Sequence, residues 1–160
     1  MKKIILTVAL CLVAVASFAQ GGKSIYKKYS DEPGVSAVYI SSAMFKMMGS
    51  LPEVEIADED VDITPAVQSL TGMYVLESEN AAVSKRLLAN VKNMVDQKPY
   101  ELLMETKDED ERTFMYAMEK DGYIESFVIL TSDEEDCTFV CFEGRILQDD
   151  FQNLLSSVNR

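Results

Sequence analysis

Apolar and polar residues alternate with a period of two along most of the second half of the chain. Four such runs follow one another at residues 100–107, 113–118, 123–130 and 137–146. A period of two places successive side chains on opposite faces of a β-strand. Acidic or Asp-Gly turns separate the runs, and such turns are typical of hairpins. The pattern therefore predicts a four-stranded antiparallel meander.

The apolar positions of residues 81–97 recur instead with the period of an α-helix. Asn80 is a good N-cap residue, and Pro99 ends the pattern. An apolar stripe on one side of a helix is expected to pack on a sheet. The stripe consists of Val83, Leu87, Leu88, Val91, Met94 and Val95.

Shorter patterns complete the set of elements. β-rich runs occur at residues 35–41 and 73–77, and short helices are expected at 24–30, 43–48 and 65–71. A terminal helix is expected to start at Asp149 or Asp150, with one apolar face formed by Phe151, Leu154, Leu155 and Val158. Because strands and helices are partly segregated, we predict an α+β fold: an antiparallel sheet with helices packed mainly on one face.

The last β-run has two apolar faces, and only one can be the main core face. The first face consists of Thr138, Val140, Phe142 and Ile146. The second consists of Cys137, Phe139 and Cys141, followed by the charged Glu143 and Arg145. Because the second face becomes charged, we expect the first to point into the core. Something else is then expected to cover the cysteine end of the second.

The N-terminus has the pattern of a signal peptide over residues 1–19. Lys2 and Lys3 precede an apolar run at residues 4–16. Ser17 and Ala19 then place small residues at the two positions that a signal peptidase recognises. We expect cleavage after Ala19, export to the periplasm or beyond, and a single domain at residues 20–160. A retained N-terminal anchor is the less favoured alternative, and no transmembrane segment is expected after signal removal.

Charge and composition exclude several function classes. The formal net charge is −12, and such a surface disfavours nucleic acid, whose phosphates are bound mainly by Lys and Arg. The chain has no histidine, so the commonest general base and metal ligand is missing. No cofactor motif is recognisable, and we expect no cofactor and no enzymatic activity.

Cys137 and Cys141 are the two cysteines outside the signal segment. On one strand, their Cα atoms would be about 13 Å apart, because each residue spans roughly 3.3 Å. A disulfide needs Cα atoms within about 7 Å. We therefore expect two free thiols packed as small hydrophobic groups. The alternative with a chemical function is that the two thiols form a redox or metal-binding pair.

Two further segments suggest binding. Met44, Phe45 and Met48 belong to a methionine-rich helix, which either fills the core or forms an adaptable groove. Residues 58–62 begin like a calcium loop, with acidic residues at alternate positions. The required glycine and final glutamate are absent, so we expect at most weak calcium binding there.

The sequence resembles an exported family of Bacteroidetes proteins, the domain of unknown function DUF4252. The resemblance rests on VSAVYISSAMFKMM, on GMYVLESEN before the long helix, and on Tyr100-Glu101-Leu102-Leu103. It extends to YIESFVILTSDEED and FVCFEGRILQDDFQNLL near the end. These motifs are structural, so the resemblance implies a fold and a compartment but no activity and no site residues.

Three functions remain open. The first is a non-enzymatic module of the cell envelope that binds another envelope protein. The second is a carrier of a small apolar molecule or lipid, held between sheet and helices by Met44, Phe45, Met48, Phe114 and Tyr116. The candidate partner surface also includes Cys137, Phe139 and Cys141. The third, a hydrolase using Glu101 and Glu105, is disfavoured because alternating Glu on a strand is typical of a solvated face.

Overall fold

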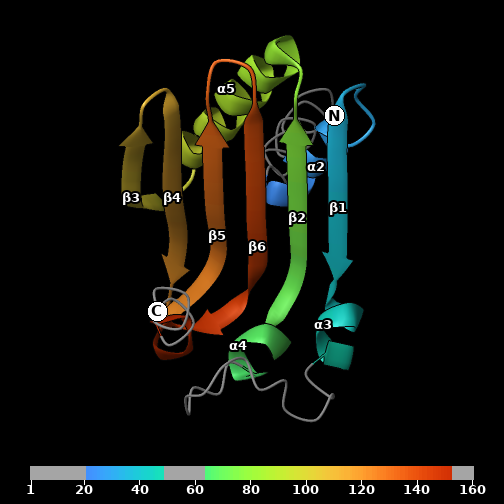
Figure 1. Ribbon diagram of the computed structural model, residues 1–160. Helices are drawn as coiled ribbons and strands as arrows, with labels where there is room; N and C mark the ends of the chain where they lie inside the picture. The colour runs from blue at the N-terminus through green and yellow to red at the C-terminus, as the bar shows by residue number, and fades with distance from the viewer. Residues whose placement is uncertain (1–20, 49–63, 153–160) are drawn as a thin grey trace, which may run out of the picture.

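A computed structural model describes residues 21–48 and 64–152. One antiparallel sheet of six strands organises this part of the chain, in the order β1-β2-β6-β5-β4-β3 (Figure 1). The strands are β1 (Val35–Ser41), β2 (Leu70–Ser78), β3 (Tyr100–Asp108), β4 (Glu111–Lys120), β5 (Tyr123–Ser132) and β6 (Cys137–Leu147). The last four strands pair consecutively, which confirms the predicted meander.

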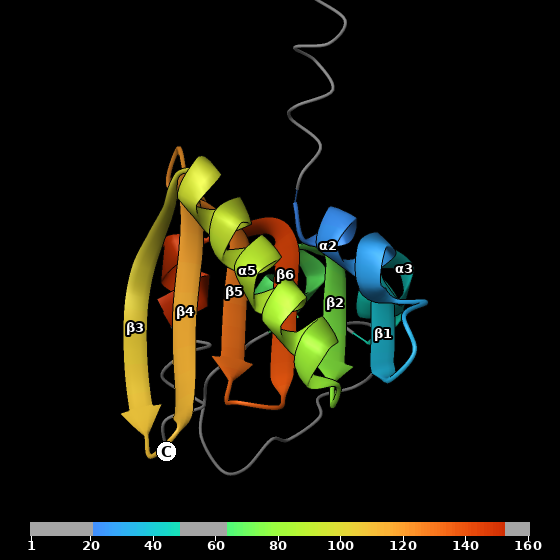
Figure 2. The same cartoon turned by 90° about the horizontal axis from the view of Figure 1, so that it is seen from above.

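Two helices, α2 (Gly22–Tyr29) and α5 (Ala81–Gln97), lie on one face of the sheet (Figure 2). The short helices α3 (Ser42–Met48) and α4 (Thr64–Gln68) lie instead at the lower end of the strands in Figure 1. Residues 148–152 are also helical. This arrangement confirms the predicted α+β fold, with its main helices on one face.

Local sequence explains where α5 begins. The Asn80 side-chain oxygen accepts hydrogen bonds from the backbone N–H groups of Ala82, at 3.0 Å, and Val83, at 3.2 Å. These bonds satisfy two of the donors that a helix leaves unpaired at its start. The predicted stripe then faces the sheet, and within it Leu87 and Val91 are fully buried. The expected boundaries of this helix, residues 81–97, are confirmed.

The sheet face under α2 and α5 is the main core face. It carries Leu76, Val128, Leu130, Phe139 and both cysteines, all almost completely buried. The expectation that Val140 and Phe142 face the main core was therefore wrong. Alternation separates the two faces of a strand, but the helices decide which face is covered, and here both faces are apolar.

Smaller differences also have a structural cause. The helix expected at 65–71 ends at Gln68, because Leu70 already belongs to β2 and pairs with Gly144. Phe151 is buried, as predicted. The other expected apolar residues of the terminal helix, the signal peptide and the acidic segment at 58–62 lie outside the described residues.

Candidate interaction surface

The sheet face opposite α2 and α5 carries an apolar residue on every strand at the same level. The strand register aligns these six side chains from one edge of the sheet to the other. We call them the apolar row: Val38, Val75, Val140, Ile129, Met115 and Met104. Cross-strand neighbours of this kind stabilise one another and form one continuous surface.

A second row lies next to the apolar row, on the side nearer the β3–β4 and β5–β6 turns. The threonine row consists of Thr106, Thr113, Thr131 and Thr138, and continues into Glu77 and Ser36. The hydroxyl groups of Thr113 and Thr131 are 3.0 Å apart and form a hydrogen bond. Toward the β3–β4 and β5–β6 turns, this face of the sheet therefore changes from apolar side chains in the apolar row to polar side chains in the next row.

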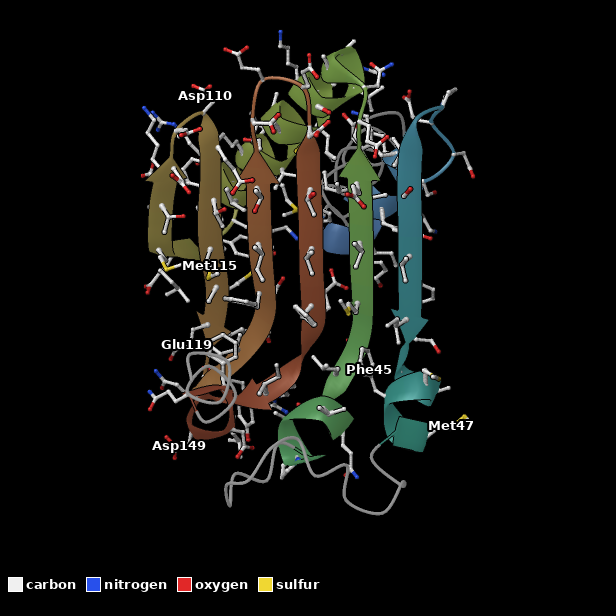
Figure 3. All side chains as sticks on the ribbon, in the orientation of Figure 1. Phe45, Met47, Asp110, Met115, Glu119 and Asp149 are labelled. Atoms are coloured by element: carbon white, nitrogen blue, oxygen red, sulfur yellow. The ribbon has the colours of Figure 1, made fainter. Side chains whose placement is uncertain are left out.

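Only the lower part of this face is covered by described residues. Phe45 from α3 and Ala66 from α4 are buried there, and the Phe151 ring meets Phe127 edge-on at 5.0 Å. The apolar row lies above this cluster, and its members Ile129 and Met115 pack against it. The row is open at both ends, where Val38 is 50% and Met104 is 40% exposed. Figure 3 shows this face, with Met115 above the level of Phe45 and Glu119.

Cys137 and Cys141 lie on the other face, in the core, and both are free thiols. Burial raises the pKa of each to about 12, so both stay protonated at neutral pH. The Cys141 sulfur lies 3.5 Å from the Ser126 hydroxyl, which accepts a 2.8 Å hydrogen bond from the Tyr100 hydroxyl. Cys137, Phe139 and Cys141, predicted as part of a partner surface, are therefore buried in the core, because α2 and α5 cover them.

The residues expected to line a ligand pocket do not surround one cavity, although the Phe114 and Tyr116 rings stack with centroids 6.2 Å apart. Phe114 and Tyr116 belong to the helix-covered side, whereas Phe45 is buried in the cluster on the opposite side. Met44 is 49% exposed on α3. The backbone of Met48 ends α3, and its side chain lies outside what the structure describes. A hollow of about 150 Å³ does occur between α2 and α5, but polar residues such as Ser24, Lys28 and Asn90 help to line it.

Glu101 and Glu105 do not form a carboxylate pair. A β-bulge at Leu103 interrupts the alternation, so Glu101 aligns with Ala117 while Glu105 aligns with Phe114 on the opposite face. Glu105 instead forms a 3.1 Å ion pair with Arg112. In the described ranges, no three Cys, Asp or Glu side chains are placed to hold a metal ion.

Sequence reasoning missed the apolar row as a surface. The signal was present, because β2 and β6 carry apolar residues at successive positions: Leu76 beside Val75, and Phe139 beside Val140. Strands that are apolar on both faces are typical of a sheet covered on both sides. Here only one side of this part of the sheet is covered by described elements.

The fold and this surface define an α+β protein with an antiparallel sheet and helices on one face, whose second face is covered only in its lower part by the described residues. The chain belongs to the family described as Domain of unknown function (DUF4252), whose match covers residues 28–154. Comparison with curated proteins found no match, and comparison with solved structures found none. Among the described helices, none has the length and hydrophobicity needed to cross a membrane.

Proposed function

We propose that this chain is an exported, non-enzymatic binding module that holds an envelope protein against the open face of its sheet. The observation that carries the proposal is the apolar row, which extends across all six strands without a covering element among the described residues. Large contiguous apolar patches on a folded protein commonly mark interaction sites, because leaving them in water costs free energy.

The proposal of a non-enzymatic role rests on the chemistry of the side chains. The chain contains no histidine, and its two described thiols are buried and protonated. Glu101 and Glu105 lie on opposite faces of β3. Export rests on the signal-like residues 1–19.

Site-specific photo-crosslinking in the producing cell tests the location of the partner. A photoreactive amino acid would be placed at Met104 or Val38 on the open face. Matched controls are Leu102 and Tyr39, which are 52% and 48% exposed on the same two strands. Their side chains point to the opposite face of the sheet. We expect protein-sized adducts at Met104 and Val38 only; equal adducts at all four positions, or none at the open-face pair, would contradict the proposal.

Carriage of a small apolar molecule is the alternative, and it has less structural support. The residues expected to line its pocket lie on two sides of the sheet, with Phe45 on one side and Phe114 on the other. Native mass spectrometry of the purified chain separates the two functions. A stoichiometric apolar molecule bound to the chain would favour the carrier.

A further inference from the structure

The charged side chains around the apolar row have one dominant sign. At the end of the sheet marked by Asp110 in Figure 3, the β3–β4 and β5–β6 turns lie side by side. Every charged residue of residues 108–111 and 133–136 is acidic. Glu77, in the threonine row, adds a carboxylate two residues along β2 from Val75, which corresponds to roughly 7 Å.

The lower end of the open face is also predominantly acidic. Glu119 aligns with Ile124 on this face, and Asp149 lies below it in Figure 3. Asp121 and Asp150 are close to them in the chain. The described cations at this end are Lys46, Lys120 and Arg145, and the Arg145 guanidinium lies 4.1 Å from the centre of the Tyr123 ring. The apolar row is therefore bordered by carboxylates at both ends of the strands, with the stronger single-sign charge at the Asp110 end.

The described cations are concentrated in the other layer of the molecule. Helices α2 and α5 carry Lys23, Lys27, Lys28, Lys85, Arg86 and Lys92. Near the Asp110 end, Lys107 aligns with Arg112 on the helix side of the sheet, and Arg112 is paired with Glu105. These cations therefore do not neutralise the carboxylates that border the open face.

We infer that the surface docking on the apolar row is itself apolar and is flanked by lysine or arginine side chains that meet the carboxylates at the Asp110 end. This inference rests on the proposed function and specifies the chemistry of the partner. Complementary charge around an apolar contact increases the association rate and excludes wrong partners. Exposed pairs of this kind weaken with added salt, because the screening length shortens to a few ångströms.

Two other occupants fit the charge pattern poorly. A second copy laid face to face would place acidic strand ends opposite acidic strand ends, and the whole chain has a net charge of −12. An anionic membrane surface would be repelled by the same carboxylates. A partner with a basic border is the occupant that charge complementarity supports.

Two designed peptides test this chemistry with the chain comprising residues 20–160. Both contain the same short alternating Val-Thr core; one is flanked by lysines and the other by glutamates. Fluorescence anisotropy of the labelled peptides gives their Kd values at about 0.05 M and about 0.5 M salt. We expect the lysine-flanked peptide to bind at least about tenfold more tightly at low salt, with most of that preference lost at high salt.

Two variants of the chain separate the apolar and charged contributions. Val75→Thr combined with Val140→Thr should weaken binding of the lysine-flanked peptide by about tenfold or more, because it removes the centre of the apolar contact. Glu77→Gln combined with Glu111→Gln should leave binding of the glutamate-flanked peptide unweakened and reduce the preference for lysine several-fold. Thermal unfolding checks that each variant remains folded.

The outcomes distinguish failure of this inference from failure of the proposed function. Equal binding of both peptides, lost in the Val75/Val140 variant, would keep the open face as a binding site and overturn the basic partner. Failure of both peptides to bind, or binding unaffected by that variant, would overturn the inference, while photo-crosslinking at Met104 still tests the function independently. Salt-insensitive dimerisation or vesicle binding abolished by the same variant would identify a second copy or a lipid surface instead.

Discussion

Gly22, in the first turn of α2, lies directly against Cys141 of β6. A β-carbon at Gly22 would overlap the Cys141 sulfur and would stand 2.8 Å from the Cys141 β-carbon. Real β-carbons are essentially never found this close to other heavy atoms. The absence of a side chain at position 22 therefore lets the first turn of α2 approach the sheet over the two cysteines.

Gly22→Ala should accordingly lower the free energy of unfolding by about 1–3 kcal/mol, because the added methyl group must push α2 away from β6. Gly21→Ala is the matched control. Its β-carbon would meet the ends of two flexible side chains, the Glu143 carboxylate at 2.9 Å and the Lys98 Nζ at 3.8 Å, so we expect a loss below about 1 kcal/mol. Urea denaturation measures both values; a Gly22→Ala protein as stable as Gly21→Ala would show that α2 does not need this close approach.

The buried thiols make stability depend on alkaline pH. In the native protein, burial raises the pKa of Cys137 and Cys141 to about 12, against 9.0 for an unperturbed thiol. Between these values the unfolded chain releases thiol protons that the native chain retains. Stability is therefore complete below about pH 9 and falls as pH rises, by up to about 1.4 kcal/mol per pH unit for each thiol.

Urea denaturation at several pH values between about 8 and about 10 measures this slope. Tyr74 and Tyr100 contribute in the same direction at the upper end, because burial also raises the pKa of each phenol. The control is a double variant, Cys137→Ala with Cys141→Ala, which should be less stable at neutral pH but should lose less stability on alkalinisation. An unchanged slope in this variant would assign the pH dependence to other groups.

The N-cap of α5 is expected to contribute measurably to stability. Asn80→Ala removes the acceptor for the Ala82 and Val83 N–H groups and should cost about 1 kcal/mol. Asn80→Asp keeps an acceptor oxygen and places a negative charge at the positive end of the helix dipole, so it should retain most of the stability. Chemical denaturation gives the free energy of unfolding of both variants. Equal losses of stability in the two variants would mean that the cap interaction contributes little.

Neighbouring residues of β2 test which face of the sheet is the main core. Leu76 is fully buried under the helices, whereas Val75 lies in the apolar row and is partly exposed. Leu76→Ala should therefore cost about 2–5 kcal/mol. Val75→Ala should cost about 1 kcal/mol or less, since its methyl groups are incompletely removed from water. Similar losses for the two variants would indicate that a further element covers the open face.

Most of the fold could be predicted from local patterns. The helix at residues 81–97 carries its own start signal in Asn80, and its stripe identifies the buried side. The meander follows from period-two alternation and from turns such as Asp121-Gly122. In that turn both residues have positive φ, 54° for Asp121 and 78° for Gly122. These features depend on residues close together in the sequence, so the sequence is sufficient to locate them.

The candidate surface could not be predicted in the same way. Alternation correctly placed Val140 opposite Phe139 and Cys141 but could not show which of these faces α2 and α5 would cover. The β-bulge at Leu103 similarly separated Glu101 from Glu105, although strict alternation would have placed both on one face.

The sequence by itself thus determined the elements, their approximate boundaries, the acidic charge and the absence of histidine chemistry, because each depends on residue type and short-range spacing. The prediction that Cys137 and Cys141 are free thiols packed as small hydrophobic groups is confirmed. Tertiary structure alone decided that α2 and α5 cover the cysteine face of β6, and that Val38, Val75, Val140, Ile129, Met115 and Met104 form one row. Both outcomes depend on strand order, register and helix docking. Those relationships join residues far apart in the chain, and the free energy of packing selects among alternatives that local patterns leave equivalent.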